Sequence, residues 1–444
     1  MNHAQLALTV LDDLSFYVTI YVILVALYMV LYRKMYWGLF DPLVWTVTSM
    51  AGGAFCVFFL SHQMQLDPLY KWSFLTTEVA LFTGLVVARY IPPIRLDFVS
   101  QPEVVPGEEN IITEFDIFTW VIGTMYIGCE IVSFMVVGIV LFDEGANHLS
   151  AFAEHGILMA FITSYRMLCP LVLFYKMLIL KQKFNLFDII CWFFAAFGIL
   201  TTGSKGAILI FIFQYFMMQF PLIYQGKIKP LKISGIFILV LACFPVLVLS
   251  ITSGADAMGA VQGVFIRLLS SGDIFLLGYN DAVMASITEK SFLNYAFYPG
   301  WGTVLKNLGF DFTPPQAIGA DILNYHYGRT DGGPTSRYNY VALHFLGFWG
   351  AIIYSGFIGT FIGVIRNSFK TLDPTRISYF GYILVTLIVY VSNILIDDIN
   401  IFMNYVFWRT SFLTLSYLAS KIIFLIIKNR ASSLSVSQNI QNLQ

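Results

Sequence analysis

The sequence is poor in charged residues, which make up 11% of its 444 residues, whereas soluble domains usually carry about 25%. It also shows no alternating ten-residue strands of the kind that build a membrane β-barrel. Apolar residues make up 58% of the chain, and apolar runs of about 20 residues, long enough to cross a bilayer, recur along it. We therefore expect an all-α polytopic integral membrane protein.

Cysteine is scarce, and the first 13 residues contain no lysine or arginine. The five cysteines are scattered through apolar runs, at Cys56, Cys129, Cys169, Cys191 and Cys243. This spacing excludes a disulfide framework and a zinc site, so we interpret the cysteines as small packing residues. A start without lysine or arginine, followed by so long an apolar run, is not typical of a cleavable signal.

The apolar runs predict about eleven transmembrane helices, within a range of 10–12, in a single domain comprising residues 1–444. The predicted spans are 14–32, 39–61, 72–91, 116–142, 152–178, 185–203, 206–224, 233–252, 341–365, 378–396 and 402–427.

Basic residues gather at every second connection between these spans, and 16 of the 25 lie there. They are Arg33, Lys34, Arg89, Arg95, Lys176, Lys181, Lys183, Lys227, Lys229, Lys232, Arg366, Lys370, Arg376, Lys421, Lys428 and Arg430. The positive-inside rule then places the C-terminus in the cytoplasm and the N-terminus outside. Residues 253–340 become one long external loop, and 431–444 a disordered cytoplasmic tail.

The external loop is expected to contain amphipathic helices. Apolar residues recur at helical intervals around Arg267, which predicts a helix on or dipping into the membrane surface. The stretch FYPGWGTVLKNLGF is rich in aromatics and glycine and predicts an interfacial turn segment. The stretch PPQAIGADILNYHYG predicts a short helix that starts at its prolines.

Nine basic residues lie outside the cytoplasmic connections, and we interpret Lys71, Lys290 and Lys306 as solvated. Arg166 is near the middle of a span, where an arginine must face the bundle interior or a watery cavity. It would pair with Glu130 or Glu78, or bind substrate.

Arg409 lies about two turns from the outer end of the last predicted span, with Asp397 and Asp398 as possible structural partners. Lys205 lies in a Gly-Ser-Lys-Gly turn that opens a span, and such a turn suits an anion or serves as an interfacial cap.

The stretch YHYGRTDGGPTSRYNY, residues 325–340, is the most polar part of the external loop. Arg329 and Arg337 flank its Gly-Gly-Pro turn, and paired arginines hold phosphate oxygens in a bidentate way. His326 precedes the turn and is a candidate general base. Tyr325, Tyr338 and Tyr340 are candidates for stacking on sugars. Solvated loop charges are the alternative interpretation.

At GSKGAILIF and GGPTSRYNYVALHFLGFWGAIIY the chain resembles the Wzy-type O-antigen polymerases, which are related to O-antigen ligases. The resemblance implies a periplasmic-face enzyme of the bacterial inner membrane. Such an enzyme polymerises oligosaccharide repeat units on undecaprenyl pyrophosphate, and the lipid diphosphate is the leaving group. It also implies a role in lipopolysaccharide biosynthesis. The implied partners are membrane lipid and a chain-length regulator protein, and no nucleic acid is expected.

Carried over by position, the resemblance implies that Lys205, Arg329 and Arg337 bind the diphosphate. To these we add Arg166, Arg267 and Arg409 on physical grounds. Fixed guanidinium groups would stabilise the charge that develops on the leaving diphosphate. His326 would take the proton of the acceptor hydroxyl, with Asp273, Asp331, Asp397 and Asp398 as alternatives. No outward Asp-x-Asp pairing is present, so we expect neither a metal nor another cofactor.

Two other functions remain open from the sequence. An O-antigen ligase would use the same donor and a lipid A-core acceptor. A flippase or other transporter of lipid-linked oligosaccharides belongs to a different class, and it usually shows broken helices or paired half-repeats. The single long asymmetric loop favours an enzyme over a transporter.

Overall fold

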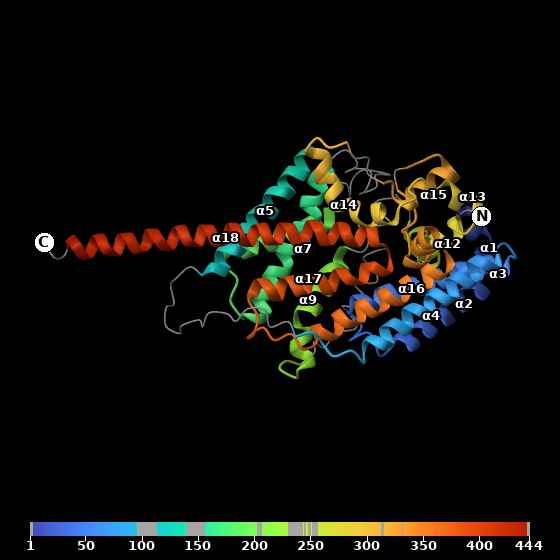
Figure 1. Ribbon diagram of the computed structural model, residues 1–444, viewed down its shortest axis with the longest axis horizontal. Helices are drawn as coiled ribbons and strands as arrows, with labels where there is room; N and C mark the ends of the chain where they lie inside the picture. The colour runs from blue at the N-terminus through green and yellow to red at the C-terminus, as the bar shows by residue number, and fades with distance from the viewer. Residues whose placement is uncertain are drawn as a thin grey trace.

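The structure is a computed structural model (Figure 1). It describes residues 3–95, 113–138, 156–201, 207–229 and 256–441 except 312–314 and 331, and the isolated positions 243, 246 and 250. Within these residues the fold is entirely helical. The confirmed fold class is therefore an all-α protein.

Eight helices are long and apolar enough to cross a membrane in the described part of the chain. They are α2 (Leu14–Tyr32), α3 (Pro42–His62), α4 (Pro68–Ala88), α5 (Glu114–Val136), α7 (Gly156–Phe174) with the π-helical turn η2 (Tyr175–Ile179), α16 (Tyr338–Phe369), α17 (Tyr379–Ser392) with the 3₁₀ turn η4 (Asn393–Ile396), and α18 (Ile399–Gln441). The protein is membrane-embedded.

Two further predicted spans, 185–203 and 206–224, coincide with the shorter apolar helices α8 (Leu186–Thr201) and α9 (Ala207–Tyr224). The predicted span 233–252 lies almost entirely outside the described residues. The number eleven therefore remains a prediction.

Two of the spanning helices begin with the same dipeptide, Asp-Pro. The carboxylates of Asp41 and Asp67 accept hydrogen bonds from the backbone N–H groups of Leu43 and Leu69, at 3.0 and 2.7 Å. Each Asp caps its helix and the following proline occupies the first turn, where its missing N–H costs nothing. The local sequence alone fixes these starts.

Helices α4 and α16 run side by side (Figure 1) because glycines remove the side chains between them. A Cβ on Gly84 would lie 2.3 Å from the carbonyl oxygen of Gly356, and one on Gly359 would lie 2.2 Å from that of Leu81. Small residues at such contacts let membrane helices approach closely and gain dispersion energy. The α4–α16 pair is therefore a rigid support for what lies at its ends.

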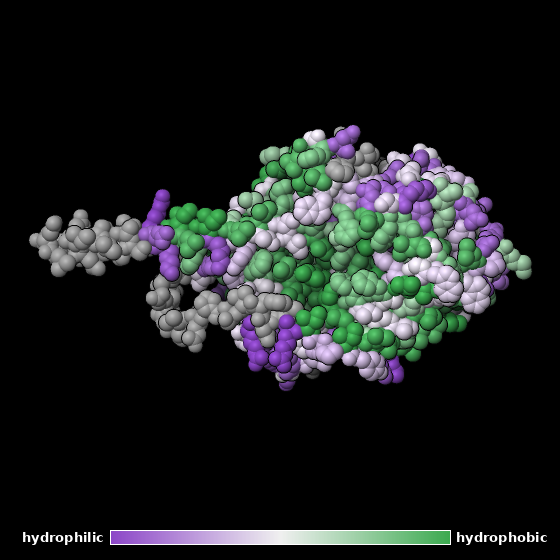
Figure 2. Space-filling model, viewed as in Figure 1, coloured by the Kyte–Doolittle hydropathy of each residue, from purple (hydrophilic) through white to green (hydrophobic). Residues whose placement is uncertain are grey.

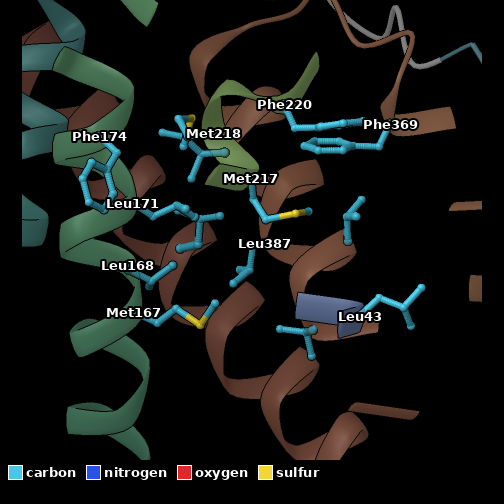
Figure 3. Close-up of a cluster of buried hydrophobic side chains, with 14 of the residues drawn as sticks. Leu43, Met167, Leu168, Leu171, Phe174, Met217, Met218, Phe220, Phe369 and Leu387 are labelled. Atoms are coloured by element: carbon cyan, nitrogen blue, oxygen red, sulfur yellow. The ribbon is translucent and has the colours of Figure 1, made fainter. Parts of the chain in front are cut away.

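The larger hydrophobic core joins α7, α9, α16 and α17 in the bundle interior. Figure 3 shows Phe220 of α9 and Phe369 of α16 facing each other there, with ring centroids 6.4 Å apart. Met217 and Leu387 lie close to them in the same view. A second core joins the start of the chain, one end of α3 and α4 and the segment 269–343.

Residues 257–327 fold onto that end of the bundle as a series of short helices. They are α11 (Ala257–Leu269), η3 (Ser270–Gly272), α12 (Asp273–Gly278), α13 (Asp281–Ser286), α14 (Phe292–Asn307) and α15 (Ile318–Tyr327), and α1 (His3–Asp12) lies at the same end (Figure 1). The whole of α12 is buried. Helices are thus present in the predicted loop, although its external position is untested.

The turn predicted for FYPGWGTVLKNLGF is wrong, since most of it belongs to α14. This helix packs along α18, and a Cβ on Gly300 would lie 2.4 Å from the Phe407 ring. Tertiary packing therefore overrides the local Pro-Gly signal. The predicted short helix exists as α15, which begins three residues after Pro315.

Hydrophobic residues cover much of the middle of the face shown in Figure 2. Hydrophilic residues gather near α13 and α15 at one end, and again at the opposite end. This distribution is typical of a bundle that crosses a bilayer. At the C-terminus α18 extends to Gln441, where we had predicted a disordered tail at 431–444. Residues 431–441 contain neither proline nor glycine to end the helix.

Candidate functional site

The Gly-Gly-Pro turn is held against α15 by direct backbone contact. Gly333 has a φ of 139°, and a Cβ on it would lie 2.0 Å from the carbonyl oxygen of Gly319. Only glycine combines this backbone conformation with so close an approach. The following residues lead into α16, and Arg337 is buried at its start with 5% of its surface exposed.

Arg337 is the centre of a polar group that we call the Arg337 cluster: Arg337, Asp397, Ser49 and the carbonyl of Ser271. The guanidinium donates to the Asp397 carboxylate, to the Ser49 hydroxyl and, at 3.0 Å, to the Ser271 carbonyl. Its Nε has no hydrogen-bond partner among the described residues. The Asp397 side chain keeps 31% of its surface exposed, so the cluster is accessible from that side.

The turn η3 reaches the Arg337 cluster because glycines line both sides of its contact with α3. A Cβ on Gly272 would lie 2.3 Å from Gly53 Cα, and one on Gly52 would lie 1.7 Å from Ser271 Oγ. The missing side chains bring the Ser271 carbonyl within reach of Arg337. Four segments far apart in sequence therefore meet at one guanidinium.

Asp398, next to Asp397, is buried and fully hydrogen-bonded. It accepts from the Tyr295 hydroxyl at 2.7 Å and from the Asn400 backbone N–H at 2.9 Å. Burial raises the pKa of Asp398 from 3.8 to about 6, and these hydrogen bonds partly oppose the rise. Asp398 fixes α14 to the start of α18, whereas Asp397 is the accessible carboxylate of the two.

Asp398 should make stability depend on pH. Because its folded pKa of about 6 exceeds the unfolded value, the folded state binds the proton more tightly. The free energy of unfolding should fall by roughly 3 kcal/mol in all as the pH rises from below about 4 to above about 6. Thermal unfolding of the detergent-solubilised protein would measure this. In Asp398→Asn the slope should disappear from this window, and an unchanged slope would assign it to another group.

Glu78 of α4 is a buried carboxylate that the sequence offered only as a partner for Arg166. It accepts hydrogen bonds from the hydroxyls of Tyr28 and Tyr338, at 3.1 and 3.0 Å, and from the Asn339 amide at 3.5 Å. It forms no ion pair within the described structure. Two of its donors directly follow Arg337, so Glu78 positions the start of α16.

Arg409 of α18 is buried, with 7% of its surface exposed. Its guanidinium lies 3.8 Å from the Tyr405 ring centroid. Its Nε and Nη1 have no hydrogen-bond partner in the part of the chain that the structure describes. A cation left this way inside a membrane helix costs several kcal/mol. Arg409 is therefore a buried cation whose charge is balanced by no carboxylate within the described structure.

Two other predicted diphosphate ligands are each paired with a carboxylate. Arg166 binds Glu130 through two hydrogen bonds, of 2.5 and 2.8 Å, which is the structural alternative that the sequence left open. Arg267 lies 3.0 Å from Asp273 and is largely exposed. These pairings lower the capacity of both arginines to bind a further anion, because their charge is already neutralised.

The remaining predicted residues lie in or beside α15 and at the start of α16, whereas Arg409 is in α18. Tyr338 and Tyr340 are buried, and Tyr340 donates to the Gly278 carbonyl at 3.2 Å. Tyr325 and Arg329 are exposed on and just beyond α15. A ring nitrogen of His326, Nε2, lies 2.9 Å from the Leu277 carbonyl oxygen.

Lys205 lies outside the described residues, as does Asp331. The sugar-binding and catalytic roles assigned from the sequence stay predictions. Segment 269–273 connects Arg267 to the Arg337 cluster, because Ser271 binds Arg337 and Asp273 binds Arg267. No hydrogen bond or ion pair between described residues joins Arg166 or Arg409 to that cluster.

No group of three or more His, Cys, Asp or Glu side chains that could hold a metal ion occurs among the described residues. Ser49, the Ser271 carbonyl and Glu78 were not identified from the sequence as parts of this site. A polar residue within a span was the only signal for Glu78, and a backbone carbonyl has no sequence signal.

No protein-family model matches the chain, and neither a curated protein nor a solved structure was found to be similar to it.

Proposed function

We propose that the protein is a glycosyltransferase that polymerises undecaprenyl-pyrophosphate-linked O-antigen repeat units. It would act at the periplasmic face of the inner membrane, with its N-terminus periplasmic and its C-terminus cytoplasmic. The sequence resemblance gives the family, and the basic connections give the orientation.

The buried guanidinium of Arg409, with two N–H groups unpartnered among the described residues, is the observation that carries this proposal. The charge of a membrane-buried arginine must be balanced, and a bound diphosphate would accept both hydrogen bonds. Tyr405 beneath the guanidinium would hold its plane in place. A leaving diphosphate gains charge as the glycosidic bond breaks, so Arg409 would stabilise the transition state.

The acceptor hydroxyl must lose a proton, and two groups support that step. If the Nε2 of His326 donates to the Leu277 carbonyl, Nδ1 is the nitrogen left to accept the proton. Asp397 is partly exposed and is oriented by Arg337. Either group would act as the general base, and no metal enters the proposed step.

Substitution of Arg409 tests the proposal. In proteoliposomes with lipid-linked repeat units, Arg409→Gln should lower the polymerisation rate about 100-fold, the effect of removing one preorganised donor group. Arg409→Lys keeps the charge and loses the planar guanidinium, so its rate should lie between those of the wild type and Arg409→Gln. Arg376→Ala, at an exposed position, is the control and should polymerise as the wild type does. Wild-type ladders from Arg409→Gln would reject the site.

The same assay separates the other functions. A ligase would transfer preformed polymer to lipid A-core and would not extend lipid-linked units. A transporter would move lipid-linked oligosaccharide across the bilayer without forming a glycosidic bond. Either result would replace the polymerase proposal.

A further inference from the structure

An apolar groove of about 640 Å³ lies between α2, α3 and α4. This volume falls in the range of sites that bind small molecules. The apolar and aromatic residues that line it are Leu24, Leu27, Tyr28, Leu31, Tyr32, Ala54, Val57, Phe58, Phe74, Leu75, Val79 and Phe82. Leu27, Leu75 and Val79 are largely exposed, so the groove is accessible from the lipid-facing side of the bundle.

The length of the groove matches one leaflet of a bilayer. Along α4 it extends from Lys71 to Phe82, which at 1.5 Å per residue is roughly 16 Å. Half of a hydrocarbon core of about 30 Å is roughly 15 Å. At its deep end the rings of Phe82 and Tyr32 pack edge to face, with centroids 5.3 Å apart. The groove therefore fits a stretch of hydrocarbon chain that lies along the helices, such as the first few isoprene units of a longer chain.

The shallow end of the groove is polar and basic. Ser61 and His62 end α3 there, and Lys71 lies in the first turn of α4. Lys71 forms no ion pair with any carboxylate in the described structure. A lysine beside an imidazole and a hydroxyl at the membrane surface suits an anionic headgroup, which a chain in the groove would place there. From the sequence alone we had interpreted Lys71 as merely solvated.

One wall of the groove is shared with the Arg337 cluster. Glu78 lines the groove, and it accepts hydrogen bonds from Tyr338 and Asn339, the two residues that follow Arg337. An occupant of the groove would therefore lie one residue layer away from the candidate site. Arg409 is on α18, which packs mainly against α5, α7 and α14. The groove and Arg409 thus belong to different parts of the bundle.

We propose that this groove binds the chain of a polyprenyl phosphate lipid, with its phosphate at Lys71 and His62. The inference rests on the proposed function, in which two lipid-linked substrates meet. Arg409 would hold the diphosphate of the donor, and the groove would hold the carrier of the acceptor. The carrier has a single chain, as one channel bounded by three helices requires, whereas a bilayer phospholipid has two.

Retention of undecaprenyl phosphate by the full-length protein tests the groove. The protein is extracted from vesicles of phosphatidylglycerol containing a few per cent of undecaprenyl phosphate, and native mass spectrometry identifies the lipid retained. The wild type should retain one undecaprenyl phosphate. Leu75→Trp fills the groove and should reduce retention at least tenfold. Leu69→Trp, on the same helix and outside the lining, is the matched control and should retain it.

Lys71→Gln provides a second variant at an exposed position, where folding is not at risk. It should reduce retention of undecaprenyl phosphate about fivefold. The difference in retention between the wild type and Lys71→Gln should decrease with added salt. Preferential retention of phosphatidylglycerol would make the groove an ordinary bilayer-lipid site and overturn the proposal. Equal retention by the wild type and Leu75→Trp would overturn it as well.

Polymerisation, measured separately on the same variants, distinguishes the groove from the function. If the wild type and Leu75→Trp retain the carrier equally and both polymerise, the groove proposal fails and the polymerase proposal stands. If the wild type retains the carrier in a Leu75-dependent way but forms no glycosidic bond, the groove stands and the polymerase proposal fails.

Discussion

Arg337→Ala should abolish long polymer, with a loss of at least about 10³-fold in polymerisation rate. The substitution removes the guanidinium, leaves Asp397 unpaired and frees the Ser271 carbonyl, so charge, orientation and the position of η3 change together. Ladders of lipid-linked polymer from reconstituted protein would show the loss. Wild-type ladders would remove Arg337 from the proposed site.

A structural explanation for that loss can be separated from a catalytic one. Because Asp397 is 31% exposed, water can solvate it after Arg337 is removed, and the stability cost should be only about 1–3 kcal/mol. The double variant Arg337→Ala/Asp397→Ala removes both charges and should recover most of this stability. If polymerisation recovers with stability, Arg337 acts only through folding.

Asp41→Ala should destabilise the protein by about 3–5 kcal/mol, because it leaves the charge of Arg366 buried without its carboxylate partner. Both side chains are almost completely buried, and the guanidinium binds both carboxylate oxygens. Asp41 also accepts the backbone N–H of Trp37 at 2.7 Å and caps α3. Thermal unfolding in detergent would measure the loss, and Arg366→Ala should show a similar one.

The exposed pair Lys227–Asp373 is the matched control for this prediction. Its two charged groups are 3.0 Å apart, but the lysine side chain is 43% exposed and the aspartate 21%. Solvent screening and side-chain entropy leave such a pair worth less than about 1 kcal/mol, so Lys227→Ala should scarcely change unfolding. Equal effects in the two pairs would contradict our account of burial at Asp41.

The buried Asp41–Arg366 pair changes the interpretation of the charge pattern along the sequence. We counted Arg366 and Lys176 among the basic residues of the cytoplasmic connections, where the positive-inside rule treats them as solvated. The structure buries both, against Asp41 and Asp188 respectively. Part of the pattern that predicts orientation therefore comes from internal ion pairs, which have no preferred side of a membrane. Reporter fusions at the two termini would test the orientation directly.

Most of the helical framework was predictable because it depends on local properties. A run of 20 apolar residues is long enough to span a bilayer. There its backbone groups must form their hydrogen bonds within the segment, which requires a helix. The Asp-Pro pairs fix the starts of α3 and α4 by the same local logic. FYPGWGTVLKNLGF was mispredicted because its helix is stabilised by α18, more than 90 residues further along the chain.

The candidate site was only partly predictable. Arg337 and Arg409 were identified because a charge in or beside an apolar run is conspicuous, whatever surrounds it. The partner of each buried arginine could not be predicted in the same way. For Arg166 the sequence left two carboxylates possible, and in the structure it binds Glu130. Pairing depends on which faces of distant helices meet, and hydropathy carries no information about rotation around a helix axis.

The sequence by itself determined that this is a helical membrane protein with one polar turn before α16, since composition and periodicity are properties of each segment alone. Only the tertiary structure decided that Arg337 is buried beneath η3, that Arg409 lacks a partner among the described residues, and that a groove separates α2, α3 and α4. The first of these features arises where Gly53 and Gly272 allow segments distant in the chain to touch. Contact of that kind is set by packing between helices, which no single segment encodes.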